Sequence, residues 1–232
     1  MTTPTETPMA VAQGRLTTPR AAGVAGIVFS LLFAASVIIM RSVVEPGSMG
    51  PLADAAGLTL QHVAIVPAYL LPFAGIAFLW FIGVVRDLIG AHEDQFFATV
   101  FLGSGIVFVA MVFAAASVLT GLLTLNQPTG PNAELGQSIA RAMFYMFGAR
   151  SAGVFTLVTS TIVLRIGALP KWTALVGLAV GLVLLLGVQA FDMVILLFPV
   201  WVGLMSLLLL VKSSTMNVKK APEDSISRSS KA

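Results

Sequence analysis

One run of 30 residues, Phe96–Leu125, contains no charged side chain. A helix rises about 1.5 Å per residue, so this run exceeds the length needed to cross a hydrocarbon core of about 30 Å. The whole chain is 57% hydrophobic and 10% charged, with a mean hydropathy of +0.97, whereas soluble domains carry about 25% charged residues. The sequence therefore predicts an all-α, polytopic membrane protein.

Six apolar segments are predicted to form a bundle of six transmembrane helices. The last apolar stretch, Thr173–Val211, would be nearly 60 Å long as one helix. It is therefore divided at its polar break, Gly187–Asp192. A polar loop is expected at 126–141, and disordered cytoplasmic tails are expected at 1–20 and 212–232. The predicted spans are 21–40, 62–85, 96–125, 142–164, 173–189 and 193–211.

The first apolar run, Ala21–Met40, has two interpretations. A secretory signal peptide has an apolar region of about 7–15 residues and a small-residue cleavage site. This run has 20 residues, which is the length of a membrane span. We therefore interpret it as a retained span.

The distribution of Lys and Arg predicts the orientation. With six spans, ten of these residues share the side of the two tails, and only Arg41 and Arg141 lie on the opposite side. Cytoplasmic segments are enriched in Lys and Arg, so both termini are predicted to be cytoplasmic. Five spans would place the basic C-terminal tail outside, which the same rule disfavours.

Small residues recur at helical spacing within three spans, where they allow a neighbouring helix to approach closely. A Gly-x-x-x-Gly pair lies in the fifth span, and faces of small side chains lie in the first and third spans. These sets are Gly177 and Gly181; Ala22, Gly26 and Ser30; and Ala110, Ala114, Ser117 and Gly121.

Arg150 is the only Lys or Arg well inside an apolar run. An unpaired arginine in the membrane costs at least a few kcal/mol, so it is expected to face the bundle and find an acceptor. Asp192, at the turn of the last hairpin, is the preferred partner in an intramembrane ion pair. This pair either fixes how two spans pack or forms a gate, a substrate anchor or an anion site. Lesser acceptors are Gln189, Tyr145, Glu134 and His62.

The fourth span also has a face of small and polar side chains. Tyr145, Thr156 and Ser160, with Ala149 and Ala152 between them, recur in steps of three and four residues. Such a face lines a polar path, or its hydroxyls bond backbone carbonyls and neighbouring helices, as Ser and Thr in membrane helices mostly do.

Several kinds of chemistry find no support in the sequence. Cysteine is absent, which excludes disulfides and thiolate metal sites. The two histidines, His62 and His92, are not paired within a span, as bis-histidine haem would require. Asp87 and His92–Asp94 are interpreted as a solvated connector rather than a metal site. No enzyme motif is present, so we expect no catalytic residues, no metal, no cofactor and no nucleic-acid partner.

Three stretches, Phe78–Gly105, Ala149–Gly177 and Phe198–Leu210, resemble a group of uncharacterised bacterial, mainly actinobacterial, multi-pass membrane proteins. The resemblance implies a small integral membrane protein of the bacterial plasma membrane, in which an arginine like Arg150 and a turn like Pro170–Trp172 belong to the pattern. Near Asp192 such relatives often carry Trp or Glu instead. The resemblance implies no activity.

Two functional hypotheses follow. The first is a non-enzymatic membrane protein that packs against lipids, a membrane-protein partner or further copies of itself. The alternative is a small transporter or permease with a site at Arg150 in the outer half of the bilayer, where Pro67, Pro72 and Pro199 would break helices.

Overall fold

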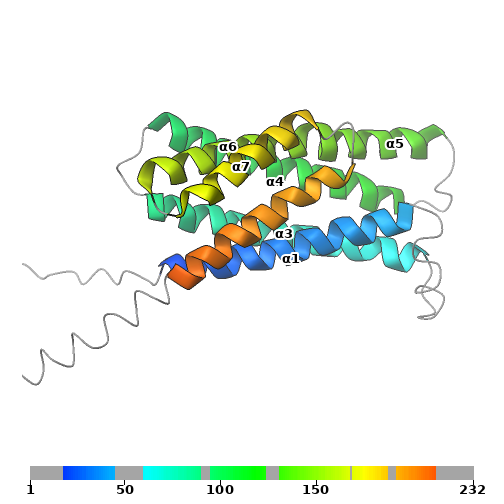
Figure 1. Cartoon of the computed structure of the whole chain (residues 1–232). Helices are drawn as coiled ribbons and strands as arrows, with labels where there is room; N and C mark the ends of the chain where they lie inside the picture. Colours follow the sequence, from blue (N-terminus) through cyan, green and yellow to red (C-terminus); the bar gives the residue numbers. More distant parts are fainter. Residues whose placement is uncertain are drawn as a thin grey trace, which may run out of the picture.

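The computed structural model describes residues 18–44, 60–89, 95–123, 131–167, 169–187 and 192–212, and every regular element in these ranges is a helix (Figure 1). Five of the helices are long and apolar enough to cross a membrane, and α7 is a shorter apolar helix. The predicted all-helical membrane class is therefore confirmed. The elements are α1 (Thr18–Val44), α3 (Leu60–Ile89), α4 (Gln95–Leu123), α5 (Pro131–Arg141), η2 (Ala142–Gly148), α6 (Ala149–Ile166), α7 (Lys171–Leu186), η3 (Asp192–Leu196) and the C-terminal helix (residues 197–212).

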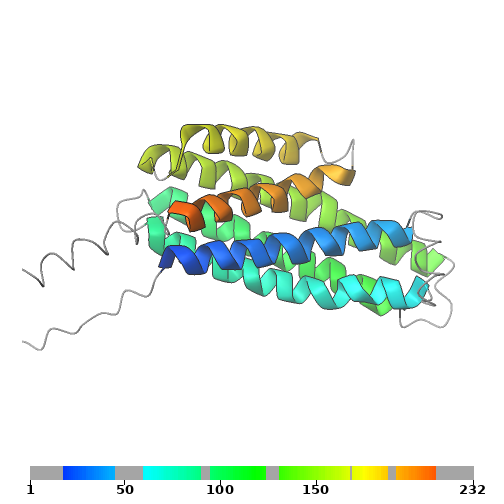
Figure 2. The ribbon, with the colours of Figure 1, turned by 60° about the horizontal axis from the view of Figure 1, so that its bottom comes forward.

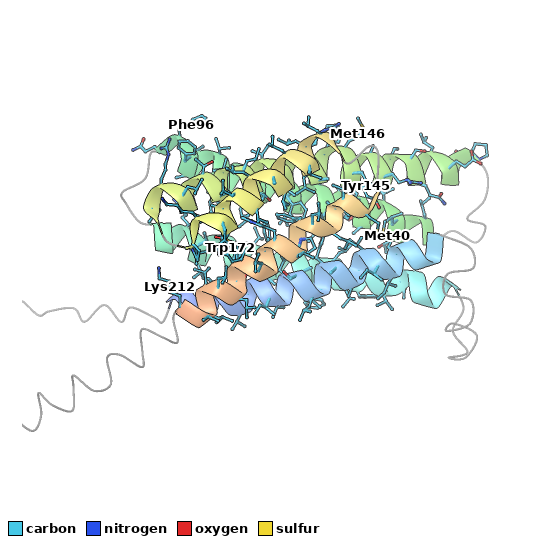
Figure 3. The ribbon with its side chains drawn as sticks, in the orientation of Figure 1. Met40, Phe96, Tyr145, Met146, Trp172 and Lys212 are labelled. Carbon is cyan, nitrogen blue, oxygen red and sulfur yellow. The ribbon has the colours of Figure 1, made fainter. Side chains whose placement is uncertain are left out.

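The helices run side by side along one bundle axis (Figures 1 and 2). The beginning of α1 and the end of the C-terminal helix lie at the same end of the bundle, which we call the tail end. Phe96, Trp172 and Lys212 lie toward this end, and Met40 and Met146 lie toward the other, which we call the far end (Figure 3). Arg165 at the end of α6 lies over the Phe97 ring at the start of α4, 4.3 Å from its centroid.

Residues 131–141, predicted as part of a loop, form helix α5 instead. Pro131 is the first residue of α5, a position where its missing N–H costs no hydrogen bond. Glu134 lies in the first turn and Arg141 in the last, as the helix dipole favours. The helix continues through η2, a seven-residue π-helix, directly into α6. The predicted fourth span, 142–164, is thus the C-terminal part of a longer continuous helix.

α7 and the C-terminal helix form a hairpin that is shorter than the rest of the bundle. Gly167 ends α6 with a φ of 64°, a left-handed conformation that glycine adopts without strain. α7 then has 16 residues, about 24 Å of helix. Toward the far end, α7 and η3 stop before the ends of α1, α3 and α5 (Figures 1 and 2).

A cluster of phenylalanine rings fills the centre of the bundle. Phe198 of the C-terminal helix contacts four other rings, with centroid distances from 4.9 Å to Phe108 to 6.1 Å to Phe155. Edge-on and tilted ring pairs of this kind contribute about 0.5–1.5 kcal/mol each beyond burial. The cluster joins α1, α3, α4, α6, η2 and the C-terminal helix, through Phe29, Phe33, Phe78, Phe81, Phe101, Phe108, Phe144, Phe155 and Phe198.

Two of the three predicted small-residue faces pack against other helices. Gly26 of α1 lies against Ser206 of the C-terminal helix, and the Ser30 hydroxyl donates to the Pro199 carbonyl at 2.6 Å. Gly181 of α7 lies against Leu157 of α6, and a Cβ added to it would be 3.0 Å from the Gly153 carbonyl oxygen. The backbones approach closely because these positions carry little or no side chain.

Candidate functional site

The predicted polar face of α6 is buried between helices. Thr156 and Ser160 have no exposed surface, and neither do Ala149 and Ala152. The Thr156 hydroxyl donates to the Ala152 carbonyl at 2.8 Å, one turn earlier in the same helix. Thr159 and Thr161 bond their own helix in the same way. These hydroxyls donate to carbonyls of their own helix, which is typical of a face that packs against other helices.

Ser160 is the exception on this face. Among the described residues, its hydroxyl and the Trp201 indole Nε1 are both buried without a hydrogen-bond partner. Both atoms lie against Gly177 of α7: a Cβ there would overlap the Ser160 Oγ and be 2.5 Å from the Trp201 Nε1. Three helices thus bring a donor and a hydroxyl together inside the bundle, where an unpaired polar group costs about 1–3 kcal/mol.

Trp201 and Ser206, on the C-terminal helix, were not predicted as notable residues. Trp201 is 1% exposed, while Trp80 and Trp172 are 69% and 51% exposed. Tryptophan in membrane proteins is enriched at the two interfaces. Trp201 instead lies 11 residues from Lys212, about 16 Å along the helix. Its central place in an apolar run was the signal that could have identified it.

Arg150 lies near the start of α6 and is partly buried. Its Nη1 donates to the Met146 carbonyl at 3.1 Å, so the side chain turns back toward η2 and the far end. Within the described part of the chain, this is the one hydrogen bond of the guanidinium, and its acceptor carries no charge. Several of the five N–H donors of the side chain are left for other acceptors.

Tyr145 lies on η2, one turn before Arg150. It is half-buried, and its ring meets the Phe144 ring edge-on at 5.1 Å. The predicted face joins Tyr145 to Thr156 and Ser160 by α-helical spacing. A π-helix has wider turns, with i→i+5 hydrogen bonds. α-Helical spacing therefore does not predict which side of η2 Tyr145 lies on.

Other predicted groups fall outside the described residues. The side chains of Asp192, His62 and Asp87 are not described, and neither are Gln189 and residues 92–94. The ion pair of Arg150 with Asp192 therefore stays a prediction. Glu134 is exposed on α5.

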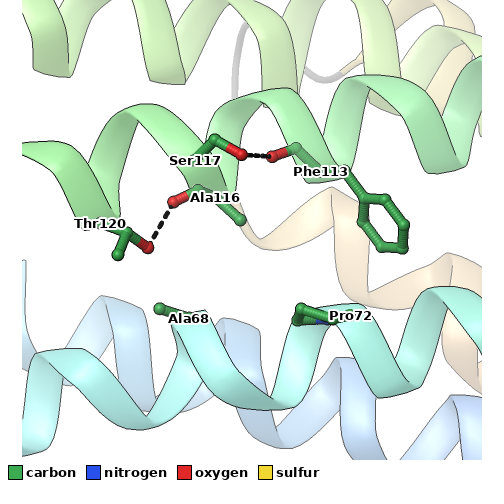
Figure 4. Close-up of a pocket in the computed structure, with 6 residues that line it drawn as sticks. All are labelled: Ala68, Pro72, Phe113, Ala116, Ser117 and Thr120. Atoms are coloured by element: carbon green, nitrogen blue, oxygen red, sulfur yellow. Dashed lines mark hydrogen bonds between the residues drawn. The ribbon is translucent and has the colours of Figure 1, made fainter.

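A groove of about 440 Å³ opens between α3 and α4 (Figure 4). The Ser117 and Thr120 hydroxyls in its wall donate to the Phe113 and Ala116 carbonyls, each at 2.8 Å. Because these hydroxyls already bond their own helix, the groove offers mainly an apolar surface. Its lining residues are Ala68, Pro72, Phe113, Ala116, Ser117 and Thr120.

The third predicted small-residue face borders this groove but is mostly uncovered. Ala110, Ser117 and Gly121 are exposed, and only Ala114 is partly covered. Outside the neighbouring backbone of α4, no described atom comes within 4 Å of a Cβ built on Gly103, two turns before Ala110. The α4 span is 28% buried, against 39–56% for the other four spans. α4 is thus the span that the described chain covers least.

These elements define a multi-pass helical membrane protein with an apolar groove and a partly buried arginine. The sequence matches no family model, no curated protein and no solved structure in the comparisons with known proteins.

Proposed function

We propose that this protein is a non-enzymatic membrane protein that acts through helix contacts within the bilayer, and that α4 packs against α4 of a second copy. The observation that carries the proposal is the low burial of α4 together with its uncovered small residues. Within a bilayer, helix association depends on close packing, and small residues permit it.

Symmetry favours a second copy as the occupant. Two copies in one membrane share their orientation, so a two-fold axis along the membrane normal brings the same face of α4 together from both. Ala110, Ser117 and Gly121 would then form each side of the contact. The Ser117 hydroxyl is already bonded within α4 at 2.8 Å, so burying it leaves no unpaired donor.

The chain contains no cysteine, so single cysteines report this contact directly. Oxidation in native membranes should link Ala110→Cys or Ser117→Cys into disulfide-bonded dimers. The control is Leu31→Cys, on α1, which is 66% exposed and also lies near mid-helix. Ala110→Leu should reduce cross-linking at Ser117→Cys. Dimer yields no higher than that of the control would contradict the proposal.

A small transporter or permease with its site at Arg150 is the second candidate. The observation in its favour is η2, because π-helical turns within α-helices often occur at functional sites. This candidate predicts that Arg150→Gln leaves the amount of protein in the membrane unchanged but abolishes an uptake or growth phenotype. If Arg150 instead fixes how two helices pack, Arg150→Gln should lower the amount of protein in the membrane.

A further inference from the structure

The charge of Arg150 lacks a charged partner among the described residues. Its Nη1 donates to the neutral Met146 carbonyl at 3.1 Å. A charged side chain within a membrane is costly and normally pairs with an opposite charge or reaches the interface. The partner that the guanidinium fork fits best is a carboxylate or a phosphate, which it binds through two parallel hydrogen bonds.

The position of Arg150 along the bundle points to phosphate. Arg165 and Trp172 mark the tail-end interface, since Arg165 is exposed beside Phe97 and Trp172 is 51% exposed. Arg150 lies 15 residues before Arg165 in α6, about 22 Å nearer the far end. Its guanidinium reaches one turn beyond, to Met146, which adds about 5 Å. The charge therefore lies near the far boundary of a core about 30 Å thick.

α7 ends close to the level of Arg150 along α6. Gly153 of α6 lies against Leu184 and Leu185 of α7, and α7 ends at Leu186. Arg150 is one turn further toward the far end than Gly153, so α7 does not continue past it. Figures 1 and 2 show α7 and η3 stopping before the far ends of α1, α3 and α5. We call the level of α6 just beyond the end of α7, beside Arg150, the hairpin step.

We propose that Arg150 binds a phosphate group at the hairpin step. The phosphate belongs to a phospholipid headgroup of the far leaflet or is free inorganic phosphate, and the two share the same recognition chemistry. The guanidinium supplies a fork of N–H donors, and Met146 holds the side chain toward the step. This site is independent of the α4 contact.

The test measures thermal unfolding of the purified full-length protein in detergent. Dioleoyl phosphatidylglycerol should raise the midpoint temperature, whereas dioleoylglycerol, which has the same chains without phosphate, should not. Arg150→Gln should weaken the apparent affinity for the phospholipid about 10- to 100-fold, as loss of a charge-assisted bond implies. Arg150→Lys should retain part of it. Arg165→Gln, at the other end of α6, is the matched control and should retain all of it.

A further arm titrates inorganic phosphate alone. An Arg150-dependent shift as large as that of the lipid would assign the site to free phosphate; a shift with the lipid only assigns it to the headgroup. Equal stabilisation by dioleoylglycerol, or an unchanged lipid response in Arg150→Gln, overturns the proposal. Arg150→Gln removes a charge that the bilayer penalises, so it is expected to fold. Native mass spectrometry of bound lipids in both proteins gives a second readout.

Asp192→Asn separates this site from the predicted ion pair. A phosphate site predicts that this variant keeps or strengthens the response to phosphatidylglycerol. If Arg150 is instead neutralised by Asp192, neither phosphatidylglycerol nor inorganic phosphate should raise the midpoint temperature of the wild-type protein. Asp192→Asn should then acquire the response, which would also overturn the proposal.

Discussion

Ser160 of α6 and Trp201 of the C-terminal helix meet at Gly177 of α7, with the serine hydroxyl and the indole nitrogen against the same glycine. Neither polar atom has a hydrogen-bond partner among the described residues. A small movement of either side chain would allow the indole N–H to donate to the serine oxygen. Glycine at 177 is what allows the two groups to meet.

Gly177→Ala should destabilise the protein by about 1–3 kcal/mol, the usual cost of overfilling a packed core. The added methyl group would overlap the Ser160 Oγ and crowd the indole of Trp201. Thermal or denaturant unfolding in detergent measures the change. Gly83→Ala is the control, because among the described residues nothing lies within 4 Å of a Cβ there. It should be neutral or slightly stabilising, since alanine favours helix. Equal stability of the two variants would refute the packing argument.

Ser206→Ala should leave stability unchanged or raise it by about 1 kcal/mol. The Ser206 Oγ is buried without a partner in the described part of the chain, so the substitution removes a desolvated polar group and no bond. The measurement is again unfolding in detergent. Thr156→Val is the comparison, because it removes the bond to Ala152. A clear loss of stability in Ser206→Ala would reveal a partner for this hydroxyl.

Gly26→Ala should be destabilising, and Ser206→Ala should partly relieve it. A methyl group at 26 would overlap the Ser206 Oγ and approach the Phe81 ring to 2.8 Å. Removing the hydroxyl frees only part of that space. A double-mutant cycle should give a coupling energy of about 0.5–3 kcal/mol, as for residues in contact. Strict additivity would show that α1 and the C-terminal helix are not this close.

Trp201 should fluoresce as a tryptophan shielded from both water and lipid. In a Trp80→Phe, Trp172→Phe background, acrylamide and brominated lipid should both quench it weakly. Single-tryptophan proteins that retain Trp80 or Trp172 are the controls. Those side chains are 69% and 51% exposed, and brominated lipid should quench them strongly. Comparable quenching of all three would place Trp201 at the bundle surface.

The predicted orientation can be tested with single cysteines in intact cells. Ser138→Cys, exposed on α5, should react with a membrane-impermeant thiol reagent, because Arg141 and the far end are predicted to face outward. Lys171→Cys, at the tail end, should react only after the membrane is permeabilised. The opposite labelling pattern would place both tails outside.

The amino-acid sequence by itself determined the membrane class of this protein and the helical form of its apolar segments. Long runs without charge, such as Phe96–Leu125, favour helices in hydrocarbon, because a helix bonds the backbone N–H and C=O groups within its own segment. Gly26 and Gly177 also indicated close helix packing. Pro131 and Glu134 carried the start of α5, but low hydrophobicity over 131–141 favoured a loop.

Only the tertiary structure decided which faces meet. Four small side chains on α4 have the same pattern as those on α1 and α7, yet Ala110, Ser117 and Gly121 remain exposed. The convergence of Ser160, Gly177 and Trp201 joins residues from three helices, and no local spacing encodes it. Helical period sets which residues share a face, whereas the choice of neighbour depends on the packing of the whole bundle. The π-helix before Arg150 and the end of α7 at Leu186 likewise come only from the structure, because the composition of these apolar segments does not distinguish a π-helical turn from an α-helical one.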